Sequence, residues 1–224
     1  MMNIRTKNKS PLIVAAIFLF LFLIVYLITT GTNGFIIDET ISFWAQDQSA
    51  PWLITFMKYA SVLGSSEMIL LITIIVGLYF LIKRNWRYFF FFFTVSVGGV
   101  ILNFLLKVLI QRERPGEETS YIETFNFTLN IQSYSFPSGH VMRATIFFLF
   151  LIYLVYQFTR RAFVKYSLYI IFIALLIGTA LSRVLLEAHF ATDVVGGVFV
   201  SIGWFFLCLY FFHKPHRRGL SFLR

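Results

Sequence analysis

The sequence has little charge and almost no cysteine. Cys208 is the only cysteine among 224 residues, so a disulfide framework and a cysteine-ligated metal site are both excluded. Charged residues make up 13% of the chain, against roughly 25% in soluble globular domains, while 58% of the residues are hydrophobic. An ordinary soluble domain is therefore excluded, and the composition is typical of a membrane protein. We expect Cys208 to be a small core or lipid-facing residue.

Six apolar stretches are long enough to cross a bilayer, or nearly so, as a helix of about 20 residues. They are Leu12–Thr30, Val62–Ile82, Tyr88–Leu106, Ala144–Phe158 with an N-terminal extension to Ser138, Tyr166–Ser182 and Val194–Phe212. The first is longer than a signal-peptide core and no small-residue cleavage site follows it, so we expect it to be retained. The sequence thus predicts an all-α integral membrane protein with six transmembrane helices.

The chain shows no linker rich in proline, glycine or serine, and we expect residues 1–224 to form a single domain. We find no internal repeat, which argues against the transporter folds that are built from inverted repeats. These two absences favour one continuous helical bundle.

The basic residues predict the orientation of the bundle. With the N-terminus in the cytoplasm, 13 of the 19 lysines and arginines (19 − 6) fall in cytoplasmic segments, and all ten acidic residues fall outside. The six outer cations are Lys58, Lys107, Arg112, Arg114, Arg143 and Arg183. An excess of lysine and arginine marks the cytoplasmic side, so both termini are predicted to be cytoplasmic. The net charge of +9 therefore reflects topology, and we expect no nucleic-acid partner.

Unusual polar residues gather where four of the predicted helices reach the outer face. They are Lys107, Arg114, Ser138, Gly139, His140, Arg183, His189 and Asp193. Several cations in one place imply an anion, and the N-terminus of the helix that starts near Ser138 offers unpaired backbone N–H groups. Gly139 removes a side chain where the backbone would approach a ligand, and arginine suits phosphate oxygens. A phosphate group is the expected ligand.

Two histidines beside a phosphate indicate chemistry. His189 and Asp193 are four residues apart, so on a helix they share a face and the carboxylate can fix the tautomer of the imidazole. His189 is then a candidate nucleophile, and His140 a candidate acid and base for the leaving oxygen and the attacking water. His140, His189 and Asp193 are also competent zinc ligands, although the nearby cations would repel a metal ion.

Three motifs resemble those of the type 2 phosphatidic acid phosphatase family. KVLIQRERP (Lys107–Pro115), PSGH (Pro137–His140) and SRVLLEAHFATD (Ser182–Asp193) match K-x(6)-R-P, P-S-G-H and S-R-x(5)-H-x(3)-D, in that order. The resemblance extends from about Leu12 to the C-terminus. It implies that His189 is the nucleophile, His140 the acid and base and Asp193 the orienting carboxylate, with no metal or other cofactor. It also implies a phosphate site formed by Lys107, Arg114, Ser138, Gly139 and Arg183.

The same resemblance implies a lipid phosphatase of the bacterial cytoplasmic membrane, with an extracytoplasmic site and a phosphohistidine intermediate. We rank the conversion of phosphatidylglycerophosphate to phosphatidylglycerol first; undecaprenyl pyrophosphate and phosphatidic acid are alternative substrates. The expected partners are the lipid phosphate and membrane lipids, with no obligate protein partner. A lipid-phosphate binding protein or a transporter is the non-enzymatic alternative, but transporters place their polar sites near the midplane rather than at helix ends.

Three further features carry expectations. Residues 31–61 contain Ile37, Ile41 and Trp44 at helical spacing, which fits either a short interfacial helix or an ordinary connecting loop. Arg143 lies one turn beyond His140, where it either meets a second phosphate or headgroup oxygen or extends to the interface. The aromatic run at 88–93 is expected to face lipid and anchor the helix at the interface.

Overall fold

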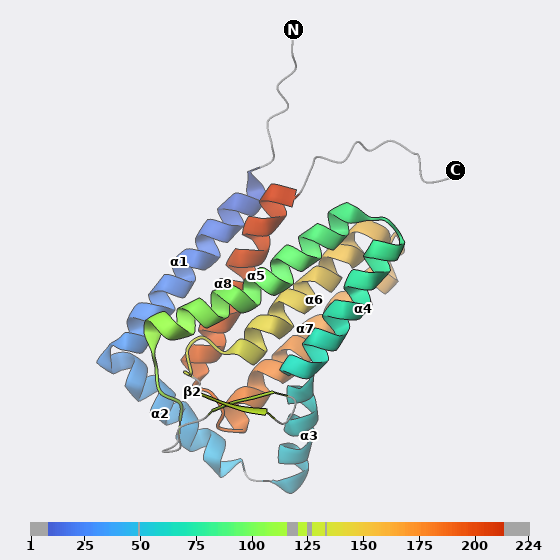
Figure 1. Ribbon diagram of the computed structural model, residues 1–224. Coiled ribbons are helices and arrows are strands. Elements are labelled where there is room, and N and C mark those ends of the chain that lie inside the picture. Colours follow the sequence, from blue (N-terminus) through green and yellow to red (C-terminus); the bar gives the residue numbers. More distant parts are fainter. Residues whose placement is uncertain (1–8, 49, 116–120, 125–126, 133, 213–224) are drawn as a thin grey trace.

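The computed structural model describes residues 9–48, 50–115, 121–124, 127–132 and 134–212. The predicted cytoplasmic termini, 1–8 and 213–224, lie outside these ranges. Within them the chain forms helices and one hairpin (Figure 1): α1 (Ser10–Thr30), α2 (Thr32–Asp47), α3 (Pro51–Val62), α4 (Ser66–Ile82), α5 (Trp86–Ile110), β1 (Tyr121–Thr124), β2 (Phe127–Gln132), α6 (Gly139–Phe158), α7 (Ala162–Leu185) and α8 (Ala191–Phe212).

The described residues contain six stretches of helix long and apolar enough to cross a membrane, as predicted. They are α1, α3 together with α4, α5, α6, α7 and α8. The hydropathy bounds were too short for α5, which continues past Lys107 to Ile110, and for α7, which begins at Ala162 rather than Tyr166. A lone cation at a helix end can extend toward the interface, so it ends an apolar run without ending the backbone hydrogen bonding.

Most of the described residues in 31–61 lie in two helices, α2 and α3, rather than in an ordinary loop. In α2 the apolar side chains of Ile37 and Trp44 are exposed, whereas Asp38 is buried with 1% of its surface exposed. α3 begins with Pro51 at its first turn, where a missing N–H leaves no helical hydrogen bond unmade. It is separated from α4 by a short elbow, at which Ser65 caps α4 by accepting a hydrogen bond from the Met68 N–H.

The hairpin was not predicted. β1 and β2 pair antiparallel within the long polar segment between α5 and α6, with Thr124 opposite Phe127. The all-α class therefore holds for the membrane bundle but not for this connection. The hairpin lies with α2 and α3 at one end of the molecule (Figure 1).

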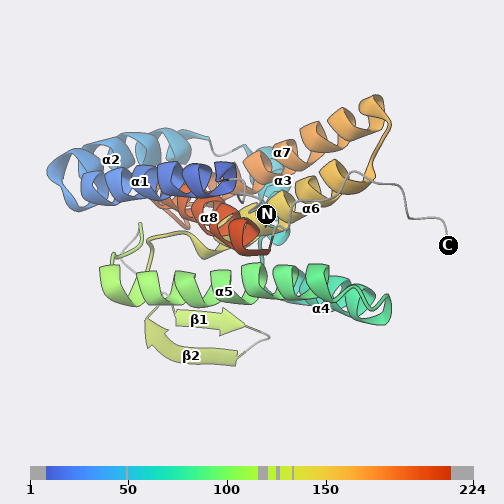
Figure 2. The same cartoon turned by 90° about the horizontal axis from the view of Figure 1, so that it is seen from above.

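The bundle packs around α6, which contacts α5, α7 and α8, while α1 lies along α8 (Figures 1 and 2). Phe91 and Phe92 are 2% and 1% exposed and pack in a core cluster with Phe150 and Cys208. The expectation that the run at 88–93 faces lipid is thus wrong for these two rings, because consecutive helical residues point in different directions and some must turn inward. Cys208 is a core residue, one of the two environments expected for it.

Candidate active site

Four helix ends meet where the sequence placed its polar residues. Lys107 lies in the last turn of α5 and Arg183 in the last turn of α7. Ser138 is the N-cap of α6, and Asp193 lies in the first turn of α8. These ends lie together at the end of the bundle that carries α2, α3 and the hairpin (Figure 1).

His189 is held by a carboxylate and a hydroxyl. Its Nδ1 lies 3.5 Å from Oδ2 of Asp193 and 3.3 Å from Oγ of Ser135. Ser135 donates its own hydroxyl hydrogen to Oδ2 of Asp193, so its oxygen is left to accept from His189. Both neighbours of Nδ1 therefore accept hydrogen bonds, which places the imidazole proton on Nδ1 and the lone pair on Nε2. Sequence reasoning missed Ser135, which is fully buried.

The pKa of His189 is lowered from 6.5 to about 3, chiefly by burial; Asp193 opposes this shift, and Arg114 and Lys107 add to it. The imidazole is therefore neutral near pH 7, with its Nε2 lone pair available. The predicted contact between His189 and Asp193 is present although His189 precedes α8, because Asp193 reaches back and also accepts from the Phe190 N–H at 2.9 Å. That backward bond is the second half of a capping box.

Two buried polar atoms in the site have no hydrogen-bond partner among the described residues. One is Oγ of Ser138, at the N-terminus of α6; the other is Nε of Arg183. Arg183 is oriented through Nη1, which donates to Oγ of Ser61 at 2.5 Å. Buried polar groups are rarely left unsatisfied, and the first N–H groups of a helix also lack intrahelical acceptors. An anion at this helix end would satisfy both kinds of donor.

The remaining predicted cations border the same region. The Nζ of Lys107 donates to the Tyr134 carbonyl, and Nη1 of Arg114 donates to the Ala188 carbonyl at 3.3 Å. Burial lowers the pKa of Arg114, an effect that Asp193 opposes. His140, in the first turn of α6, interacts electrostatically with His189 as well as with the surrounding arginines, Arg114, Arg143 and Arg183. The predicted site residues thus come together at one place.

Gly139 makes room for a residue that sequence reasoning did not single out. A Cβ at this position would lie 2.9 Å from Oδ1 of Asn103, whose Nδ2 donates to the Pro137 carbonyl at 3.0 Å. The glycine is therefore required by packing between α5 and α6. Its expected role in letting the backbone approach a phosphate stays a prediction.

Arg143 is directed at its own protein. Its Nε and Nη2 donate to the Gly64 carbonyl at 3.3 and 3.2 Å, and Nη2 lies 3.4 Å from Nδ1 of His140. These contacts account for the arginine without extension to the interface. A contact between Arg143 and a second phosphate stays a prediction.

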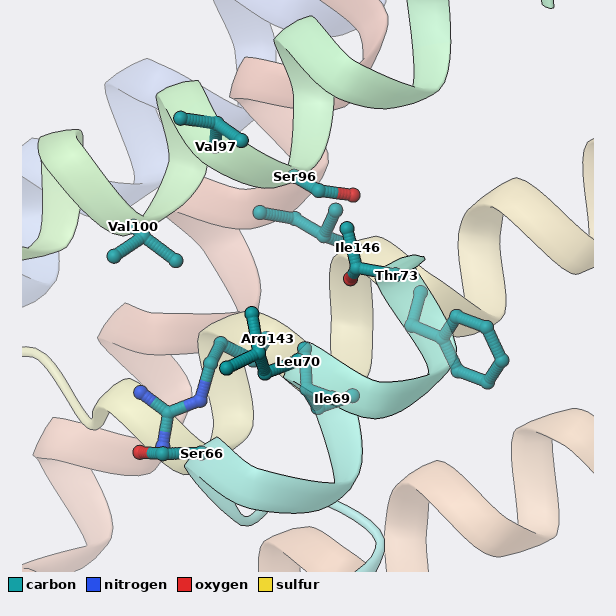
Figure 3. Close-up of a pocket in the computed structure, with 10 residues that line it drawn as sticks. Ser66, Ile69, Leu70, Thr73, Ser96, Val97, Val100, Arg143 and Ile146 are labelled. Carbon is teal, nitrogen blue, oxygen red and sulfur yellow. The ribbon is translucent and has the colours of Figure 1, made fainter. Parts of the chain in front are cut away.

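Beside Arg143 lies a cavity of about 230 Å³ between α4, α5 and α6 (Figure 3). The polar groups that line the cavity are the guanidinium of Arg143 and the hydroxyls of Ser66, Thr73 and Ser96. The rest of its wall is aliphatic and aromatic and includes Leu70, Val100 and Ile146. The cavity therefore connects an apolar space between helices with the arginine that contacts His140.

The zinc alternative finds no ligand cluster in the part of the chain that the structure describes. No three histidine, cysteine or acidic side chains are grouped there so that they could hold a metal ion. His140 is next to Arg143 instead, and Asp193 is already paired with Arg112, Ser135 and His189.

The fold and the site together define an integral membrane protein with a cluster of cations and unsatisfied hydrogen-bond donors at one end of its helices. A family model described as the PAP2 superfamily matches residues 87–217, and the chain belongs to this superfamily. The chain is 34% identical over 204 residues to phosphatidylglycerophosphatase B of Bacillus subtilis, an alignment covering 89% of this chain and 95% of the relative. It is also 34% identical over 126 residues to a lipid A 1-phosphatase of Rhizobium etli, covering 55% and 49%.

A solved structure agrees with these sequence relatives. The crystal structure of a transmembrane PAP2-type phosphatidylglycerolphosphate phosphatase from Bacillus subtilis superposes with a TM-score of 0.76 at 31% identity. The match covers 95% of this chain and all of the other. The predicted family is confirmed, and its members among these relatives indicate a hydrolase of lipid phosphates.

Proposed function

We propose that the protein is a metal-independent phosphatidylglycerophosphate phosphatase that forms a phosphohistidine on His189. The observation that carries the proposal is the orientation of His189, whose Nδ1 faces Asp193 and Ser135 so that Nε2 keeps its lone pair. Supporting observations are the unsatisfied Ser138 hydroxyl and Arg183 Nε, which offer donors to a phosphate.

The proposed reaction has two steps. In the first, Nε2 of His189 forms a bond to phosphorus as the bond from phosphorus to the lipid oxygen breaks, and His140 gives that oxygen a proton. In the second, water attacks phosphorus, His140 takes a proton from the water, and the bond between phosphorus and Nε2 breaks. Inorganic phosphate leaves, and both histidines return to their starting states.

The cations supply the electrostatic part of catalysis. Phosphoryl transfer spreads negative charge over the equatorial oxygens, and preorganised donors stabilise that charge without reorganising. Arg183 is fixed by Ser61 and is therefore preorganised in this sense. Lys107 and Arg114 are held by backbone carbonyls close to His189.

The choice of substrate rests on the relatives and on the cavity. The relative with 95% coverage is named for phosphatidylglycerophosphate, and the cavity beside Arg143 offers an apolar space that fits part of an acyl chain. With both termini in the cytoplasm, as the basic residues predict, the site faces the extracytoplasmic side and meets headgroups of the outer leaflet.

Purified protein in detergent with EDTA would test the proposal by release of phosphate. The substrates to compare are phosphatidylglycerophosphate, undecaprenyl pyrophosphate and phosphatidic acid, each with wild type and with His189→Ala. We expect the first lipid to be turned over fastest, no activity in His189→Ala, and an acid-labile, alkali-stable phosphate label on wild type only.

Each part of the proposal can fail separately. Faster turnover of undecaprenyl pyrophosphate would replace the substrate but leave the mechanism intact. Loss of activity in EDTA with recovery on adding zinc would overturn metal independence. Full activity in His189→Ala would overturn the nucleophile, and binding of all three lipids without turnover would indicate a lipid-phosphate binding protein.

A further inference from the structure

Asp38 is a buried carboxylate that neither the motifs nor the proposed chemistry uses. It lies on α2, has 1% of its surface exposed, and reaches α8 across 154 positions of sequence. Its Oδ1 accepts from the Thr192 N–H at 3.0 Å, and its Oδ2 accepts from the Thr192 hydroxyl at 2.6 Å. A charge is seldom buried without a partner, so this carboxylate requires an explanation.

Arg112 joins Asp38 to the catalytic carboxylate. Its Nη2 lies 2.6 Å from Oδ2 of Asp38, while its Nη1 donates to Oδ1 of Asp193 at 2.5 Å and to Oγ1 of Thr192 at 2.8 Å. The guanidinium also lies over the ring of Phe190, with 4.3 Å from Cζ to the centroid. The planar fork of arginine is thus shared between two buried carboxylates, an arrangement that lysine could not reproduce.

The two carboxylates also hold the start of α8. Asp38 accepts from the N–H of Thr192, and Asp193 accepts from the N–H of Phe190. Both N–H groups belong to the first turn, where no intrahelical acceptor exists and where the helix dipole favours negative charge. Since His189 directly precedes this turn, the position of its ring depends on how firmly the turn is held.

The charge on Asp38 also controls what Asp193 can do. The contact of Asp193 with Nδ1 of His189, at 3.5 Å, is longer than its contact with Arg112 at 2.5 Å. Without Asp38, Arg112 would keep a single carboxylate partner and would be drawn onto Asp193 with both arms of its fork. That rearrangement would withdraw the carboxylate from His189.

We propose that Asp38 is a positioning residue for the His189–Asp193 pair, acting through Arg112 and Thr192. The inference rests on the proposed role of His189 as nucleophile. α2 lies outside residues 87–217, the part that the family model matches, so this support for the site comes from a preceding segment of the chain. The extracytoplasmic helix thereby gains a role in catalysis without touching the substrate.

A double-mutant cycle would test the proposal, using Asp38→Asn, Arg112→Gln and the combination, with Glu39→Gln as the matched control on the exposed face of the same helix. We expect Asp38→Asn to lower kcat by about 10–100-fold, because a displacement of about 1 Å in a catalytic group can cost about 100-fold in rate, with KM changed less than about threefold. We expect the double variant to be no slower than Arg112→Gln alone, because residues that act through one another are not additive. Glu39→Gln should match wild type.

Three results would overturn the proposal: an unchanged kcat in Asp38→Asn, equal effects on kcat and KM, or a double variant whose loss is the product of the single losses. If Asp38→Asn does not fold, Thr192→Val removes the linking hydroxyl without removing a charge. It should lower kcat about threefold or more with KM unchanged, and a wild-type kcat there would equally refute the inference. His189→Ala separates the two proposals. If this variant is fully active, both the role of His189 as nucleophile and the inference on Asp38 are wrong. If it is inactive while Asp38→Asn keeps the wild-type kcat, only the inference on Asp38 is wrong.

Discussion

A single methyl group at Gly64 should disturb the active site from outside it. Gly64 lies in the elbow between α3 and α4, and a Cβ there would be 2.8 Å from the His140 carbonyl oxygen and 2.9 Å from Cγ2 of Thr179. Ordinary contacts begin at 3.4 Å, so the backbone of His140 or the elbow must move by about 0.6 Å (3.4 − 2.8). Neither can move freely, because Thr179 is fully buried and the Gly64 carbonyl accepts two hydrogen bonds from Arg143.

Two effects of Gly64→Ala on stability oppose each other. Overpacking costs about 1–3 kcal/mol, whereas replacing glycine stabilises by about 0.4–1 kcal/mol through the unfolded chain, so the net loss should be about 1–2 kcal/mol. The effect on activity should be larger, because a displacement of about 1 Å in a catalytic group can cost about 100-fold in rate. A shift of about half that size at His140 should lower kcat by about tenfold or more.

Gly178→Ala is the matched control. Gly178 is in α7, which packs on α3, and a Cβ there would lie 3.9 Å from the Cβ of Ala60, an ordinary contact. This variant should keep wild-type activity and an equal or higher melting temperature. Phosphate release and thermal unfolding of both variants in the same detergent would decide the matter. If Gly64→Ala resembles Gly178→Ala in both measurements, the elbow yields and the packing argument is wrong.

Three further predictions concern the charged groups. Because the folded protein holds the pKa of His189 at about 3 and the unfolded chain has 6.5, the unfolded state takes up the proton first, and stability should fall as the pH drops from 6.5 towards 3. Between pH 7 and pH 5 wild type should lose about 2 kcal/mol more than His189→Gln, measured by unfolding at each pH; equal losses would contradict the burial of this imidazole. Arg183→Lys should lower kcat by about 10–100-fold, because the ammonium group of lysine cannot both contact Ser61 and replace the Nε donor of the arginine. A wild-type kcat in this variant would show that Arg183 does not contribute to the reaction. Arg143→Ala should slow pyrophosphate hydrolysis more than monophosphate hydrolysis. If both activities of the variant equal those of wild type, the second-phosphate hypothesis is wrong.

The sequence was sufficient for the six spans and for the placement of the candidate site residues at neighbouring helix ends. Apolar length and loop charge do not depend on tertiary contacts, and they placed Lys107, Ser138, Arg183 and Asp193 at helix ends that meet. The motif spacing then identified which of the polar residues belong to one site. Both kinds of signal are local in sequence, which is why they could be read without the structure.

What could not be predicted depends on contacts between distant segments. Asp38 belongs to none of the motifs, and it is buried because Arg112 and Thr192 offer it partners. Ser135 stands outside the recognised motifs, and only the fold brings its hydroxyl to Asp193. The hairpin was different, since the sequence FNFTLNIQ alternates apolar and polar residues in the manner of a strand, and the acidic character of the segment obscured that signal.

The distribution of buried charge shows why this site needs its outer supports. Asp193 forms an ion pair with Arg112 and also interacts electrostatically with Lys107 and Arg114. Each of these cations could draw the carboxylate away from His189. The structure restrains each one separately: Arg112 by Asp38, Lys107 by the Tyr134 carbonyl and Arg114 by the Ala188 carbonyl. Cations that are hydrogen-bonded to fixed partners would act on a phosphate from set positions. The free-energy cost of orienting them is then met during folding and not during the reaction. The elements that provide these ties, α2 and the loop segments beside α5 and α8, therefore support the candidate site from outside the three motifs.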